Sequence, residues 1–291
     1  MLACPYFHVT VTVPEELRAA LRRHQRDGYG VLMTAAGEAI VELARDPRHV
    51  GGTVGVLAVL HTWTQQLHFH PHVHCLVTGG GLGEDGDTWH PARPSFLVPT
   101  KALARKVRGR FRAVFEKRCP GVSLPAAVWR TPWVVHITPW GVGEQAVLDY
   151  LARYVFRIAL TDRRIVGLDD ETVSFQYRDR KAGPTRTCRV PGHEFLRRYL
   201  QHVLPKGFHK VRYFGLWHPS RRSQAIRVRH ALRLDRPTGP PPRPEPQGAP
   251  DPQPSPEAGS GTPSPGRPCP RCRTGLLVVI ARWTPMRPRA P

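Results

Sequence analysis

The segment 67–77, LHFHPHVHCLV, constrains the fold of this chain more than any other part of its sequence. Its histidines stand at positions 68, 70, 72 and 74, a strict period of two. In a β-strand such residues share one face, and the residues between them face the opposite way. The sequence therefore predicts a strand that buries one face in a core and presents a row of imidazoles on the other.

His72 and His74 are the leading candidates for metal ligands, because only Val73 separates them and both rings can reach one cation. Pro71 has no N–H and suits an edge or a break in a strand, so the pattern defines His68 and His70 less closely. A row of half-exposed histidines on an edge strand is the alternative interpretation. Imidazole suits Zn, Mn, Fe or Ni, whereas phosphoryl chemistry usually recruits Mg²⁺ or Mn²⁺.

The segment 143–160, GEQAVLDYLARYVFRIAL, predicts a helix. Its expected core-facing stripe consists of Leu148, Leu151, Val155 and Ile158. Tyr150 and Tyr154 are expected together on the flank of that stripe, beside Arg153 and Arg157. Neighbouring guanidinium groups favour a phenolate and hold phosphate, which would make the tyrosines nucleophiles. Taken alone, the pair is more typical of amphipathic residues at the edge of a core.

The chain of 291 residues is strongly basic, with 43 Lys and Arg against 22 Asp and Glu, a net charge of +21. Such a balance favours a polyanionic partner, and DNA fits better than a membrane surface, because no amphipathic basic helix or lipidation signal is visible. No apolar run is long enough to cross a membrane, and the first residues do not resemble a signal peptide. The six cysteines are too sparse for a disulfide scaffold. We therefore expect a cytoplasmic, nucleoid-associated bacterial protein.

Composition divides the chain into three parts. Residues 1–235 have the patterns of a globular domain. Residues 236–268 are rich in proline and poor in apolar residues, which predicts a disordered linker, and residues 269–291 form a short tail with Cys269 and Cys272. These two cysteines are half of a four-ligand zinc site, so free thiols are favoured over zinc there.

Strand and helix patterns interleave along the globular part. Strands are expected at 6–13, 54–62, 67–77 and 133–138, with a hairpin at 173–177 and 185–190. Helices are expected at 15–25, 28–45, 101–117, 143–160 and 192–203. The glycines at 79, 80, 81 and 83 are interpreted as a turn that leaves the histidine strand. The order predicts an α+β fold with an antiparallel sheet covered by helices.

Several strings resemble the two-tyrosine rolling-circle transposases of the HUH endonuclease class. The resemblance rests on PYFHVTVTVPEELR, HPHVHCLVTGGG, DYLARYVFRIAL followed by DRRI, and HVLPKGFHKVRYFGLW, and it covers roughly residues 1–235. It implies that the histidine strand is central and that the tyrosine helix packs on the sheet. Members of that family usually carry a cysteine-rich zinc-binding domain ahead of the strand that begins here at about Tyr6. Only Cys4 precedes that strand in this sequence, so we expect a truncated copy.

The resemblance further implies the roles of the site residues. His72 and His74 would bind a divalent metal, Mg²⁺ or Mn²⁺, and the third ligand would be His70, His68 or His8. Tyr150 and Tyr154 would attack single-stranded DNA at element ends, giving a 5′-phosphotyrosine link and a free 3′-hydroxyl. The reaction would cut and rejoin DNA without ATP.

The expected DNA contacts are basic residues near these segments. They are Arg153, Arg157, Arg197, Arg198, Lys206, Lys210 and Arg212. Three other functions remain open at this stage: an inactive DNA-binding remnant, a rolling-circle replication initiator or relaxase, and a zinc hydrolase. The sequence does not identify the oligomeric state or the DNA sequence that is recognised.

Overall fold

A computed structural model describes residues 2–178, 183, 185–234, 267–268 and 276–277 of the chain. The chain divides at Thr238 into two units. In the second unit, the described residues form only the pairing of β10 (Arg267–Pro268) with β11 (Leu276–Leu277). Cys269 and Cys272, and most of the linker and tail predicted from composition, lie outside the described residues.

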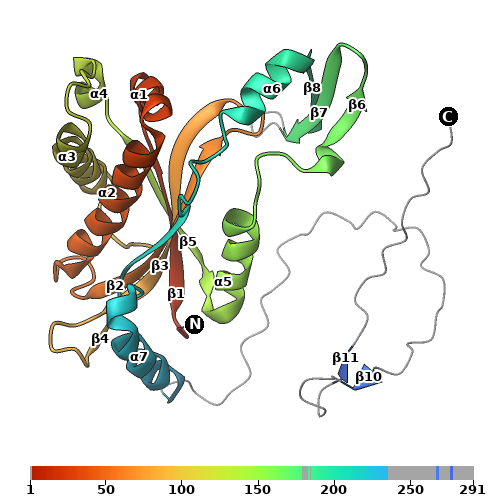
Figure 1. The fold of residues 1–291 in the computed structure, drawn as a ribbon. Helices are drawn as coiled ribbons and strands as arrows, with labels where there is room; N and C mark the ends of the chain where they lie inside the picture. The colour runs from red at the N-terminus through yellow and green to blue at the C-terminus, as the bar shows by residue number, and fades with distance from the viewer. Residues whose placement is uncertain (1, 179–182, 184, 235–266, 269–275, 278–291) are drawn as a thin grey trace. The chain divides into compact units, whose positions relative to one another are not determined.

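The first unit is built on an antiparallel sheet. Its strands follow the order β5 (Val134–Val142), β1 (Pro5–Thr12), β3 (Phe69–Leu82), β2 (Thr53–Trp63) and β9 (Val211–Gly215), and β4 (Trp89–Pro91) also pairs with β3. The strand that carries the histidines therefore lies in the middle of the sheet (Figure 1). The prediction of an α+β fold with an antiparallel sheet covered by helices is confirmed.

Helices cover one face of this sheet. They are η1 (Glu15–Leu17), α1 (Arg18–Arg23), α2 (Gln25–Arg45), α3 (Thr100–Arg118) and α4 (Ala126–Arg130) (Figure 1). Val73, Cys75 and Val77 of β3 point into the core on this side, as the period of two predicts. The α3 residues Leu103 and Phe111 are fully buried in the same apolar cluster, since apolar residues at helical spacing form one stripe.

The opposite face of the sheet is covered by α5 (Gly143–Tyr150). This helix continues into η2 (Leu151–Val155), a π-helical turn. A second apolar cluster joins Tyr6, Leu57, Leu76 and Tyr150 here. It also includes Val228 of α7 (Arg222–Leu234), which follows the short turn η4 (Pro219–Arg221).

A smaller antiparallel sheet follows the tyrosine helix. The turn η3 (Asp162–Arg164) leads into β6 (Ile165–Leu168), β7 (Thr172–Arg178) and β8 (Thr185–Pro191), and α6 (Gly192–Leu200) comes next. Its cluster of Phe175, Val190 and Leu160 includes Leu67, which lies two residues before the start of the histidine strand. The predicted hairpin is confirmed, with β6 as an additional strand.

The tyrosine helix differs from its prediction in length and in facing. It ends at Val155 rather than at residue 160, and Leu148 and Ile158 of the expected core stripe are 51% and 55% exposed. Tyr150 is fully buried instead. The stripe was misplaced because a tyrosine can anchor a core when its hydroxyl finds buried acceptors, which hydropathy alone does not register.

Gly79, Gly80 and Gly81 do not form a turn, because β3 continues through them to Leu82. They are needed for close backbone approach. A Cβ at Gly79 would lie 2.8 Å from the carbonyl oxygen of Pro5, and a Cβ at Gly81 would lie 2.6 Å from the backbone of Gly52. The interpretation as a turn was therefore wrong for these three glycines. It holds for Gly83, whose carbonyl oxygen accepts a bond from the N–H of Gly86 in the turn that leads to β4.

Candidate metal and tyrosine site

Strand register brings histidines from three strands to one face of the sheet. His72 lies opposite His61 of β2 and Thr12 of β1, and His74 lies opposite Val59 and Thr10. Residues directly opposite in antiparallel strands project on the same face. This face is the one that carries α5, so the imidazoles lie beside the tyrosine helix.

His61, His72 and His74 form a group that could hold a metal ion. One ligand atom from each histidine lies within 4.8 Å of the others. His61 and His74 are buried, and His72 is half-buried. The sequence analysis did not name His61. The signal that could have found it is a lone histidine at the end of an apolar strand, two residues beyond Val59 on the same face.

In two of these rings, a hydrogen bond determines which nitrogen remains available to bind a metal. Nδ1 of His72 donates to the carbonyl oxygen of His70 at 2.6 Å, and Nε2 of His61 donates to the carbonyl oxygen of Tyr154 at 2.8 Å. A neutral imidazole that donates from one nitrogen offers a lone pair on the other. Metal-binding histidines are typically held in this way, so the donor set fits a metal.

A fourth histidine, His8, is a neighbour of His74. Nδ1 of His74 shares a hydrogen bond of 2.9 Å with Nε2 of His8. Thr10 lies 3.3 Å from the same Nδ1. His8, one of the three expected third ligands, is therefore in contact with a predicted ligand and lies outside the three-histidine group.

The other two candidates for the third ligand lie farther out. His70 lines the wall of the pocket described below, with its ring centroid 5.2 Å from that of His72. His68 precedes β3 and is exposed. Their roles stay predictions, and the geometry favours His61 in the third position.

Burial keeps the His61 imidazole neutral. Desolvation lowers its pKa to about 4, the hydrogen bond to Tyr154 raises it, and the positive charges of Lys210 and Arg157 lower it further. A neutral imidazole is the form that binds a metal. At neutral pH the His61 imidazole is therefore already in the form that can bind a metal.

The two tyrosines lie in different surroundings. Tyr154 is half-buried and its ring centroid lies 4.1 Å from that of His74 and 4.7 Å from that of His8. Tyr150 lies deeper, and its hydroxyl donates to the carbonyl oxygen of His74 at 2.9 Å. Burial raises the pKa of Tyr150 well above its usual value.

An open pocket of about 630 Å³ contains the histidines and Tyr154. Its basic residues are Arg157, from the predicted set, and Arg164 and Arg178, which the sequence analysis did not name. Arg164 and Arg178 belong to the smaller sheet and its leading turn, whose position could not be inferred without the fold. The pocket is lined by polar and cationic groups, as a phosphate-binding site requires.

Other predicted DNA contacts lie outside this pocket. Arg153 lies over the ring of Trp140 at 5.1 Å. Arg197 and Arg198 both pair with Glu194. Exposed Lys206 accepts a bond from Arg26 through its carbonyl oxygen, and half-buried Lys210 influences His61 by its charge.

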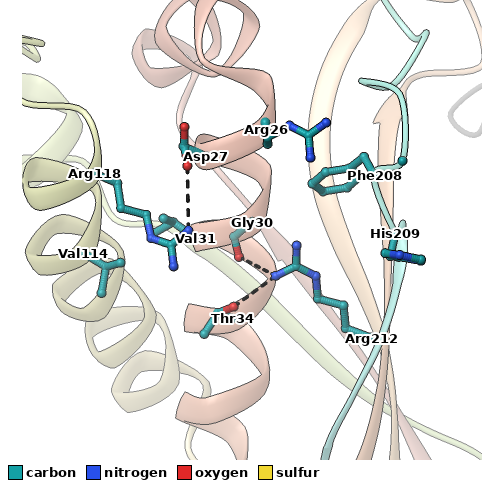
Figure 2. A pocket seen from close by; sticks show the side chains of 11 residues that line it. Arg26, Asp27, Gly30, Val31, Thr34, Val114, Arg118, Phe208, His209 and Arg212 are labelled. Atoms are coloured by element: carbon teal, nitrogen blue, oxygen red, sulfur yellow. Dashed lines mark hydrogen bonds and ion pairs between the residues drawn. The ribbon is translucent and has the colours of Figure 1, made fainter.

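Arg212 faces away from the histidines. It lies opposite Ala58, whose side chain belongs to the core under α2. Its guanidinium donates to the carbonyl oxygen of Gly30 and to Thr34, and it lies over the ring of Phe208 (Figure 2). Figure 2 also shows the pairing of Arg118 with Asp27 beside it. Arg212 thus links β9 to α2 through hydrogen bonds, on the face of the sheet opposite to His61, His72 and His74.

No helix among the described residues has both the length and the apolar character needed to cross a membrane. Cys4, Cys75, Cys119 and Cys188 have no disulfide within that part of the chain.

Fold and site together define an α+β protein with a basic pocket that joins three histidines to a tyrosine. Comparison with protein families then gives the assignment: the model of the family Y2_Tnp, described as "Putative transposase", matches residues 55–225, more than half of the chain. The chain belongs to this family.

Two curated proteins are similar to the chain. "Putative transposase y4qJ" of Sinorhizobium fredii is 38% identical over 234 residues, which are 74% of this chain and 59% of that protein. "Transposase for insertion sequence element IS801" of Pseudomonas savastanoi pv. phaseolicola is 26% identical over 259 residues, 82% of this chain and 61% of that protein. The chain thus spans about three fifths of the length of these relatives. No solved structure matches the chain.

Proposed function

We propose that this chain is a DNA strand transferase that cuts and rejoins single-stranded DNA through a 5′-phosphotyrosine intermediate. The observation that carries the proposal is the position of Tyr154 against the three-histidine group, with its ring centroid 4.1 Å from that of His74. The family assignment and the relatives described as transposases support DNA as the substrate. The HUH class and the roles of both tyrosines as nucleophiles are part of the proposal.

A divalent metal would be held by His61, His72 and His74, and it would supply positive charge that polarises the scissile phosphate. Three imidazoles suit Mn²⁺ better than Mg²⁺, which prefers oxygen ligands. We therefore propose Mn²⁺ as the better cofactor.

The chemical step uses the tyrosine hydroxyl and no external energy source. The phenolic oxygen forms a bond to phosphorus, and the bond from phosphorus to the 3′ oxygen breaks. The proton that leaves the phenol balances the proton that the 3′ oxygen gains. The covalent ester keeps the bond energy, so rejoining is the same step in reverse with a new 3′-hydroxyl.

The residues around the pocket would bind the strand. Arg157, Arg164 and Arg178 supply cations for phosphate, and Trp63 and Tyr177 in the same wall offer ring faces on which unpaired bases can stack. Single-stranded DNA fits this lining better than duplex, because stacking requires exposed bases.

A covalent-adduct assay tests the proposal. The protein is incubated with Mn²⁺ and labelled single-stranded oligonucleotides from the DNA that flanks its own coding sequence. We expect a protein–DNA adduct that survives denaturation and carries the label when the oligonucleotide is labelled at its 3′ end, because the tyrosine joins the new 5′ end. A label at the 5′ end should appear instead on the released strand with the free 3′-hydroxyl. Binding of the same oligonucleotides without any adduct would contradict the proposal and indicate a DNA-binding remnant.

A further inference from the structure

The two tyrosines of the helix are unequal in access. Tyr150 is 0% exposed, whereas Tyr154 is half-buried and lines the pocket that holds the histidines. Their ring centroids lie 5.0 Å apart, so the difference is one of depth rather than of location. Only Tyr154 belongs to the lining of the pocket in this conformation.

The hydroxyl of Tyr150 is hydrogen-bonded within the protein interior. It lies 2.9 Å from the carbonyl oxygen of His74 and 3.4 Å from that of Leu57, and it donates to these acceptors. The ring packs in the apolar cluster with Tyr6 and Leu76. A phosphate could reach this hydroxyl only if the hydrogen bonds broke and the ring left the cluster, which costs the burial of a large side chain.

Tyr154 is held toward the pocket by the way its helix ends. In the π-helical turn the N–H of Phe156 bonds the carbonyl oxygen of Leu151, and the chain then leaves the helix. The carbonyl oxygen of Tyr154 accepts its bond from His61. Because the turn and this bond fix the backbone of Tyr154, its ring stays against His74 and His8, while Tyr150 stays buried in the apolar cluster.

We infer that the two tyrosines act in a fixed order: Tyr154 forms the first phosphotyrosine bond, and Tyr150 becomes a nucleophile only after the end of the tyrosine helix has moved. The inference rests on the proposed function. In the first step the phenolic oxygen of Tyr154 bonds to phosphorus, the 3′ oxygen leaves, and one proton passes from the phenol to that oxygen. In the second step Tyr150 does the same to a second strand, after its bond to His74 has opened.

Trypsin can distinguish the two adducts, because Arg130, Arg153 and Arg157 place the tyrosines on different peptides. Tyr150 lies on the peptide 131–153 and Tyr154 on the peptide 154–157. Wild-type protein is mixed with Mn²⁺ and the flanking single-stranded oligonucleotide, and samples are quenched at successive times. The samples are digested with nuclease and trypsin, and the nucleotide-bearing peptides are measured by mass spectrometry.

At the earliest times we expect the adduct on 154–157 to exceed the adduct on 131–153 by at least about tenfold, which corresponds to about 1.4 kcal/mol between the two attacks. The adduct on 131–153 should rise later. An adduct that appears first or equally on 131–153 would overturn the order and leave the proposed function standing. Absence of any adduct would overturn both.

A variant provides the second readout. In Tyr154→Phe the ring that packs against His74 and His8 is kept and only the hydroxyl is lost, so circular dichroism and the melting temperature should match those of the wild type. We expect the early adduct to disappear. If Tyr150 formed an adduct in this variant at the rate of the first wild-type adduct, the two tyrosines would be interchangeable and the order would be wrong.

Discussion

Nε2 of His61 donates a hydrogen bond to the backbone carbonyl oxygen of Tyr154 at 2.8 Å, which ties a proposed metal ligand to a predicted nucleophile. His61 comes from β2 and Tyr154 from the end of the helix that crosses the same face of the sheet. The bond occupies Nε2 of His61 and leaves Nδ1 as the nitrogen that can bind a metal. One residue can therefore place both the metal and the tyrosine.

Replacement of His61 by alanine should weaken Mn²⁺ binding by about 100-fold or more, because only two of the three imidazoles remain. Free Mn²⁺ measured by electron paramagnetic resonance during a titration gives the affinity. His68→Ala is the matched control, since His68 is exposed and lies outside the three-histidine group. Its affinity should stay within about twofold of the wild type. If His68→Ala weakened Mn²⁺ binding and His61→Ala did not, His68 would be the third metal ligand.

DNA cleavage should require less Mn²⁺ than Mg²⁺. Three nitrogen ligands suit the softer Mn²⁺, and Mg²⁺ loses its preferred oxygen shell poorly. We expect half-maximal cleavage at a Mn²⁺ concentration at least about tenfold lower than that of Mg²⁺. Cleavage titrated with each metal in turn gives both values. Equal or lower Mg²⁺ requirements would indicate that oxygen ligands dominate the site.

The metal-free protein should lose stability as the pH falls from about 6.5 to about 4. Burial lowers the folded-state pKa of His61 from 6.5 to about 4, so in this window the unfolded chain binds more protons than the folded one. The contribution of His61 is fully present above 6.5 and is lost by about pH 4, on the order of 3 kcal/mol. Burial shifts the pKa of His202 in the same direction.

Urea unfolding in the presence of a chelator at pH 7, 5.5 and 4.5 measures this dependence. His61→Gln serves as the control, because a glutamine amide does not titrate in that range. The variant should show a shallower decline of unfolding free energy than the wild type. An equal decline in both proteins would show that His61 is not the group that becomes protonated.

Alanine variants of two arginines predicted to contact DNA should have different effects, one on DNA binding and the other on stability. Arg157→Ala removes an exposed cation of the pocket and should weaken binding of single-stranded DNA, lowering the salt slope by about 1. Arg212→Ala removes the bonds to Gly30 and Thr34 and should cost about 1 to 2 kcal/mol of stability. DNA titrations at several salt concentrations and thermal melts check both. A stable Arg212→Ala protein with a lower salt slope would contradict this division.

The histidine strand could be predicted because its period of two carries the information within one segment. Val73, Cys75 and Val77 enter the core and His72 and His74 do not, as alternation requires. His61 could not be found in the same way. It reaches the site only through its register with His72, 11 residues later in the sequence, and register depends on how the two strands pair.

The tyrosine helix shows the opposite case. Its existence follows from spacing, but its facing depends on whether Tyr150 finds acceptors inside the protein. The carbonyl oxygens of His74 and Leu57 provide them, and no property of the helix sequence indicates that they are there. Arg164 and Arg178 were missed for a related reason, since the smaller sheet places them beside a pocket formed by distant strands.

Cleavage by the double variant Tyr150→Phe with Tyr154→Phe tests the central claim most directly. Wild type and variant are incubated with Mn²⁺ and the same labelled single-stranded oligonucleotide, and the released 3′-hydroxyl end is measured. We predict that the wild type releases it together with a covalent protein adduct, and that the folded double variant binds the strand and releases none. Cleavage by the double variant at the wild-type rate would contradict a tyrosine nucleophile and indicate a metal-dependent hydrolase.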